Sequence, residues 1–204
     1  MIDLTKDGKL WTVTLNRPDK ANALTAEMLT ELARIAEAAH DEARVLILTG
    51  AGKVFSAGAD LEAARAGLAT SAVWERLSSA IATFPGLSIA ALNGTVAGGA
   101  MGMVLACDLR IAANGAKAFY PVMKLGFLPQ PSDPKRLTQL MGPARAKLIL
   151  MGGHKVTTDE ALSWGLFDQV AEPDALMART LDLAADTLAA DYVHAATIKG
   201  MCRV

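Results

Sequence analysis

The stretch SIAALNGTVAGGAMGMVLACDLRIA, residues 88–112, carries the signals that decide the fold. Residues 88–92 form a short apolar run that predicts a buried strand, and the turn pair Asn93-Gly94 ends it. Small residues then open a helix over about 98–106, and a second apolar strand follows at 109–112. The interrupting glycines and the charged residues that close the stretch indicate a strand, a turn and a helix, and they argue against a membrane span.

Strands and helices alternate on both sides of this stretch. Residues 10–15 alternate as a strand does, and Thr25 is placed to cap an amphipathic helix. Residues 45–49 are continuously apolar between turn residues, which is typical of a parallel strand buried on both faces. From Pro134 onward the pattern is helical. We therefore predict an α/β fold, for which repeated ββα units fit the spacing at least as well as simple βα units.

The length of 204 residues suits a single domain, and no linker or low-complexity segment divides the chain. We expect a core over about 1–170 and terminal helices over about 171–204. The net charge of −1 provides no global field for nucleic acid or a membrane surface. The N-terminus shows no signal or transit peptide, so we expect a cytoplasmic protein without nucleic-acid or membrane partners. The two cysteines lie far apart and match no metal or disulfide spacing.

Several common site classes find no matching motif. The three histidines are scattered, so no metal site is expected. Residues 50–54 lack the spacing of a phosphate-binding loop, and residues 98–102 fall short of the dinucleotide fingerprint. No Gly-x-Ser-x-Gly segment is present, which disfavours an α/β-hydrolase.

Two loops point to a different chemistry. Phe55–Leu61 reads FSAGADL, and its small residues allow a ligand to approach the backbone closely. In Asn93–Ala100 a strand feeds a small-residue turn that opens a helix, where backbone N–H groups lack partners. Each loop alone is compatible with tight packing. Together, one N–H group from each loop would form an oxyanion hole.

These loops are two of several segments that together resemble one protein family. The segments are Leu15-Asn16-Arg17-Pro18 with Asn22-Ala23-Leu24, Phe55–Leu61, Ala90–Gly94 through Gly98-Gly99 to Cys107-Asp108, Ala118-Phe119 through Leu125–Pro129 with Arg136-Leu137, and Ala161–Val170. In this order they closely resemble the crotonase superfamily, the enoyl-CoA hydratase/isomerase family. The similarity covers essentially the whole chain.

The resemblance implies a spiral of ββα turns and an acyl-CoA substrate, with no cofactor beyond its CoA moiety. The C-terminal helical region of this sequence is shortened relative to the family. It implies that the backbone amides of Ala59 and Gly99 bind the thioester oxygen. By the same matching, the CoA-binding residues would be Arg17, Lys20, Ala21, Ala23, Ala57, Gly58, Ala59, Leu61, Gly98 and Gly99. Arg17 and Lys20 are the expected phosphate partners, although both could also be solvated surface cations. The family forms homo-oligomers, but this sequence ends at Val204, before the helix that joins its trimer contacts, and this leaves the trimer open.

The sequence also departs from the family at the positions that matter for hydration. Hydratases carry one glutamate at the position of Gly102 and a second at the position of Val122. Hydration needs one carboxylate to activate water and another to deliver or steer the proton, and neither residue here can do so. A glycine-rich turn of the family is replaced by residues 130–134. We interpret Asp133 within it as a helix N-cap, with Pro134 at the first helical position.

The side chains left for acid–base work are Tyr120, Gln130, Asp133 and Glu62, and none has a partner that the sequence identifies. Tyr120 could equally be a packed aromatic, and Glu62 a solvated helix residue. Three interpretations follow. The chain is an isomerase, thioester hydrolase or decarboxylase that uses the oxyanion hole with other acid–base groups, which we favour; or a catalytically silent acyl-CoA-binding module; or a hydratase with nonstandard acid–base residues.

Overall fold

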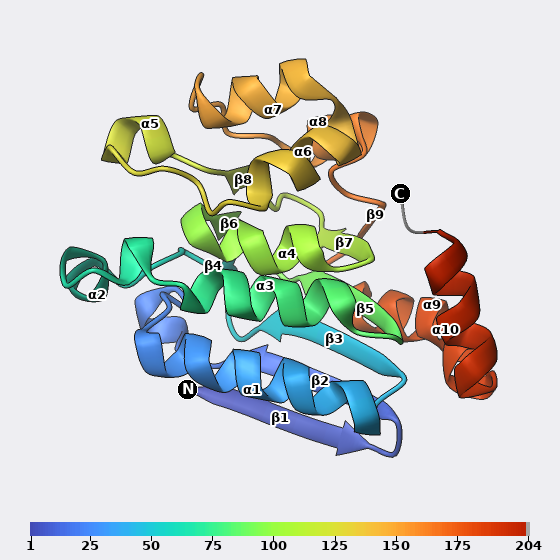
Figure 1. Ribbon diagram of the computed structural model, residues 1–204. Coiled ribbons are helices and arrows are strands. Elements are labelled where there is room, and N and C mark those ends of the chain that lie inside the picture. The colour runs from blue at the N-terminus through green and yellow to red at the C-terminus, as the bar shows by residue number, and fades with distance from the viewer. Residues whose placement is uncertain (203–204) are drawn as a thin grey trace.

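The computed structural model describes residues 1–202 as two β-sheets with helices packed around them (Figure 1). The larger sheet has the order β1-β2-β3-β5-β7-β9, in which β1 and β2 are antiparallel and all other pairs are parallel. Its strands are β1 (Ile2–Asp7), β2 (Leu10–Leu15), β3 (Val45–Gly50), β5 (Leu87–Leu92), β7 (Leu109–Ala113) and β9 (Gln169–Ala171). The smaller sheet is parallel and consists of β4 (Val54–Ser56), β6 (Thr95–Ala97) and β8 (Ala118–Phe119).

The chain builds both sheets at once. Three successive strand pairs, β3 with β4, β5 with β6 and β7 with β8, each add one strand to the larger sheet and one to the smaller. A helix follows each of the first two pairs and returns the chain to the larger sheet. The predicted α/β fold with ββα turns is therefore confirmed.

Ten α-helices and three 3-10 turns lie within residues 1–202. The helices are α1 (Ala26–Glu42), α2 (Leu61–Arg65), α3 (Val73–Thr83), α4 (Met101–Ala106), α5 (Val122–Leu125), α6 (Asp133–Met141), α7 (Pro143–Leu150), α8 (Thr158–Trp164), α9 (Leu176–Ala189) and α10 (Tyr192–Met201); the 3-10 turns are η1 (Pro18–Lys20), η2 (Leu68–Thr70) and η3 (Gly98–Ala100). The predicted cap at Thr25 is present, since its side chain accepts a hydrogen bond from the Met28 amide. Among the described residues, no helix combines the length and apolarity that a membrane crossing requires.

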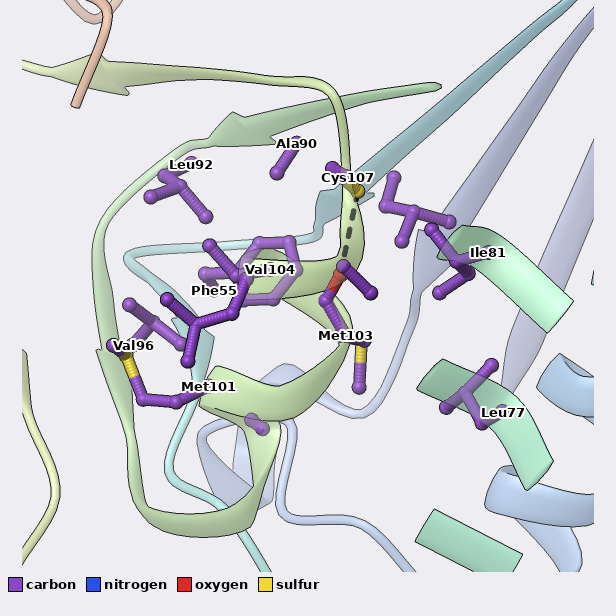
Figure 2. Packing of buried hydrophobic residues seen from close by; sticks show 14 of the residues in the cluster. Phe55, Leu77, Ile81, Ala90, Leu92, Val96, Met101, Met103, Val104 and Cys107 are labelled. Carbon is purple, nitrogen blue, oxygen red and sulfur yellow. Dashed lines mark hydrogen bonds between the residues drawn. The ribbon is translucent and has the colours of Figure 1, made fainter. Parts of the chain in front are cut away.

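The larger sheet is covered on both faces, which explains its continuously apolar strands. Helices α1, α3 and α4 pack together over one face, and α9 contacts β3, β5 and β7 from the other (Figure 1). Helix α4 contacts α3 and α6 and is buried at every residue, and Figure 2 shows Val104 and Met101 beside Phe55 and Val96. Burial raises the pKa of Cys107 to about 12, and its thiol bonds to the Met103 carbonyl, so this cysteine is an unreactive core residue.

Candidate active site

A buried asparagine joins the segment around residues 17–24 to the loop that follows β4. The side chain of Asn22 is fully buried, its oxygen accepts from the Arg17 amide, and its nitrogen donates to the carbonyls of Ala51 and Val54. The backbones of the two segments also pair directly, because the Ala57 amide donates a hydrogen bond to the Ala21 carbonyl at 2.9 Å. This network holds the segment around residues 17–24 against the FSAGADL loop.

The two predicted loops touch through their glycines. A Cβ atom added at Gly58 would lie 2.8 Å from the Ala97 carbonyl oxygen and 3.4 Å from Gly98 Cα. Gly58 has φ +91° and Gly98 has φ +58°, which are conformations that side chains rarely tolerate. Only glycine at these positions lets the backbones approach so closely. Ala59 and Gly99, one residue beyond each contact, therefore belong to neighbouring turns.

The amides of these two residues are available to a ligand. Gly99 is the second residue of η3, where an N–H group has no acceptor within its own helix, and no side chain caps that turn. Within residues 1–202, the Ala59 amide has no hydrogen-bond acceptor either, although the adjoining Asp60 amide donates to the Leu24 carbonyl. Both residues line a cavity of ≈ 340 Å³. Two amides without partners at one cavity are the candidates for an oxyanion hole.

The predicted site residues separate into four groups, one of which, Lys20, Ala21, Ala23 and Gly58, lines neither the cavity nor the surface depression described below. Those that line the cavity are Ala57, Ala59, Leu61, Gly98, Gly99, Tyr120 and Gln130, and Val122 lines it as well. Asp133 lies behind the cavity wall and is fully buried. Glu62 and Arg17 line a different surface depression, which agrees with the interpretation of Glu62 as a solvated helix residue and does not favour an acid–base role. The side chain of Glu62 is exposed, since α2 turns it outward.

The two expected phosphate partners have different surroundings. The Arg17 guanidinium binds Asp60 at 2.8 Å and also donates to the Ala23 carbonyl. This pairing holds the pKa of Asp60 below its usual range and secures Asp60 as the cap of α2, where it accepts from two backbone amides. Lys20 is exposed at the end of η1 and forms no ion pair within residues 1–202. Lys20 is therefore the freer of the two cations.

A tryptophan that the sequence did not single out supports the second loop. The Trp74 ring is buried and lines the cavity, and its Nε1 donates to the Leu68 carbonyl at 2.8 Å. A Cβ atom at Gly99 would lie 3.1 Å from the ring. The helical period places Trp74 on the buried face of α3, but no local signal shows that this face meets Gly99.

Asp133 has a role other than the predicted N-cap. It is the first residue of α6 and Ser132 occupies the cap position, so the N-cap interpretation is wrong. Its Oδ2 atom accepts from the Tyr120 hydroxyl at 2.9 Å, which draws the carboxylate into the interior and away from the helix amides. The Tyr120 oxygen also accepts from the Gln130 amide at 3.3 Å. Tyr120 is thus more than a packed aromatic, because it joins the cavity to a buried acid.

Burial dominates the electrostatics of this pair. It raises the pKa of Asp133 to about 6, because a charged carboxylate loses its hydration there. The hydrogen bond from Tyr120 and the charge of Arg136 oppose this shift only in part, and the Arg136 guanidinium stands 3.7 Å from Oδ1 without a hydrogen bond. The same burial, with the Asp133 charge nearby, raises the pKa of Tyr120 well above its ordinary value. Tyr120 therefore keeps its proton at physiological pH.

Asp133→Asn is expected to remove a contribution that lowers stability as the pH rises between about pH 4 and pH 6. Across this window the folded protein keeps a proton that the unfolded chain has released, so the free energy of unfolding falls as the pH rises. A shift of about two pKa units corresponds to about 3 kcal/mol. Urea unfolding at a series of pH values measures it in both proteins. Carboxylates with lowered pKa values, such as Asp60, are shared by both proteins and cancel in the difference. Parallel pH curves would contradict the buried-acid assignment.

The comparisons with known proteins support the family that the sequence resembles. The family model for enoyl-CoA hydratase/isomerase matches residues 5–203. A short-chain-enoyl-CoA hydratase of Clostridium acetobutylicum is 36% identical over 89% of this chain and 72% of its own length. A carnitinyl-CoA dehydratase of Citrobacter koseri is 35% identical over 99% of this chain and 80% of its own length. The solved structure of DspI from Pseudomonas aeruginosa superposes with a TM-score of 0.90 at 33% identity, covering 98% of this chain and 84% of that one. This chain belongs to the enoyl-CoA hydratase/isomerase family of the crotonase superfamily.

Proposed function

We propose that this protein processes an acyl-CoA thioester by stabilising negative charge on the thioester oxygen with the backbone amides of Ala59 and Gly99. The observation that carries the proposal is the pair of amides without partners, on touching loops, at one mainly apolar cavity. Two preorganised N–H donors stabilise the negative charge of an enolate or a tetrahedral oxyanion without the help of a side chain. The names of the relatives, a hydratase and a dehydratase of CoA esters, support the same substrate class.

The cavity lining favours isomerase, thioester hydrolase or decarboxylase chemistry over hydration. Among the described residues that line it, Arg65 is the only charged one, and no carboxylate reaches its surface. Gly102 has no side chain, and Val122 contributes only an apolar wall. The cavity therefore offers no pair of carboxylates to activate water for hydration.

A panel of CoA thioesters incubated with the protein and followed by mass spectrometry tests the proposal. Conversion of any member supports an enzyme of this class. Binding without conversion, seen by calorimetry with the same thioesters, would support the alternative of a silent acyl-CoA-binding module. No binding at millimolar ligand would reject the proposal.

Lys20→Ala is expected to weaken acyl-CoA binding by up to about fivefold at low salt, since an exposed charge contact contributes about 0.2–1 kcal/mol. The loss should shrink at high salt because mobile ions screen an exposed pair. Calorimetry with acetyl-CoA at two salt concentrations measures both effects. Lys147→Ala, which removes an exposed lysine from α7, serves as the matched control and should leave the affinity unchanged. Equal affinities of the two variants would exclude Lys20 as a phosphate contact.

A further inference from the structure

The carboxylate of Asp133 occupies the space toward which a side chain at position 102 would point. A Cβ atom added at Gly102 would lie 3.1 Å from Asp133 Oδ1 and 3.3 Å from Oδ2. The acid thus reaches from α6 to the wall of α4, at the position where the family resemblance expects a glutamate. Oδ1 is buried and has no hydrogen-bond partner within residues 1–202. A buried polar atom without a partner is costly and points to a role beyond packing.

The connection from this acid to the cavity runs through Tyr120. Tyr120 lines the cavity together with Ala59 and Gly99, whereas Asp133 does not reach its surface. The phenol donates its proton to Oδ2 and accepts from the Gln130 amide, so one lone pair of its oxygen remains open. The Gln130 side chain is tied to the Ala69 carbonyl, which fixes the segment that carries this amide.

We propose that Tyr120 and Asp133 form a proton relay that removes and returns a substrate proton next to the thioester carbonyl, with Tyr120 as the catalytic residue and Asp133 as the acceptor behind it. This inference rests on the proposed function, because it requires the thioester to sit in the oxyanion hole. Tyr120 oxygen takes the α-proton while its own proton passes to Asp133 Oδ2. The C–H electron pair forms the enolate double bond, and the carbonyl π pair moves to the oxygen held by Ala59 and Gly99. The reverse steps restore both side chains.

The charged groups around the acid are compatible with this role. Arg136 lies on the same helix as Asp133, near Oδ1. Glu75 of α3 faces the preceding residue and accepts from both the amide and the hydroxyl of Ser132. Gly102 of α4 contributes no charge. Because the pKa of Tyr120 is raised so far, a free tyrosinate is not available as a base, and proton loss must be coupled to transfer onto Asp133.

Deuterium uptake at the α-carbon of butyryl-CoA, measured by mass spectrometry in D2O, tests the relay without knowledge of the natural substrate. The unmodified protein should catalyse uptake above the protein-free rate, with a rate that rises with pH and levels off near neutrality. Tyr120→Phe should lose about 10²–10⁴-fold. Asp133→Asn keeps an oxygen acceptor for the phenol and should lose a comparable factor together with the pH dependence. Glu75→Gln, which removes a neighbouring charge that does not contact Tyr120, is the matched control and should retain uptake.

Calorimetry with butyryl-CoA and thermal unfolding accompany each variant, so that loss of binding or of folding is separated from loss of proton transfer. Retained uptake in Tyr120→Phe or Asp133→Asn, or binding without uptake by the unmodified protein, would overturn the relay and leave the oxyanion hole standing. Failure of the unmodified protein to bind butyryl-CoA would overturn the proposed function and the relay together.

Discussion

Crotonyl-CoA hydration by this protein is expected to run several orders of magnitude below that of a competent hydratase of the family. General acid–base groups contribute about 10²–10⁴-fold each, and the resemblance implies that both are missing at Gly102 and Val122. Losses of groups that act together do not add, so the combined factor lies below the product of the two. The loss of crotonyl-CoA absorbance, followed beside the Clostridium acetobutylicum short-chain-enoyl-CoA hydratase, measures it.

Restoring hydration requires three changes rather than two. Glutamates at both positions are the obvious repair, but the side chain introduced by Gly102→Glu would meet the carboxylate of Asp133. Two buried carboxylates in contact repel each other and lose hydration, which destabilises the protein. Gly102→Glu with Val122→Glu and Asp133→Gly removes that conflict. The triple variant should show more hydratase activity than the double variant and than the unmodified protein.

Melting temperatures of the double and triple variants provide the control for folding. The double variant should unfold at the lower temperature if Asp133 opposes a side chain at position 102. Rapid hydration of crotonyl-CoA by the unmodified protein would contradict the assignment and would mean that another side chain activates water.

Ala59→Pro is expected to reduce turnover of any thioester substrate by about 10²–10³-fold, since one oxyanion donor contributes about 3–4 kcal/mol to the barrier. Proline removes the N–H group at this position. Because the Ala59 amide has no acceptor among residues 1–202, the substitution deletes no hydrogen bond within them. Steady-state kinetics on whichever thioester the panel identifies, or α-proton uptake from D2O, measures the loss.

Ala59→Val is the matched control for Ala59→Pro, because it adds a comparable side-chain bulk and keeps the donor. Thermal unfolding of both variants shows whether the loop beside Gly58 tolerates the change. Equal activity of two folded variants would exclude the Ala59 amide as a catalytic donor.

Local sequence determined the fold and the two loops. The continuous apolar run at residues 45–49 is typical of a strand covered on both faces, and the structure places it inside the larger sheet. The glycines of the FSAGADL loop and of the following turn specify backbone conformations with positive φ at Gly58 and Gly98. The strands β4, β6 and β8 were not predicted, because segments of two or three residues are too short to show a period.

The surroundings of the side chains were decided only by tertiary structure. Asp133 before Pro134 satisfies every local rule for an N-cap, yet its carboxylate meets Tyr120, 13 residues away in sequence, and the glycine position of α4. Glu62 follows the FSAGADL loop directly and still faces solvent, because α2 turns it away from the cavity. Local patterns report backbone conformation and burial, whereas the partner of a side chain depends on which distant elements the packing brings to it.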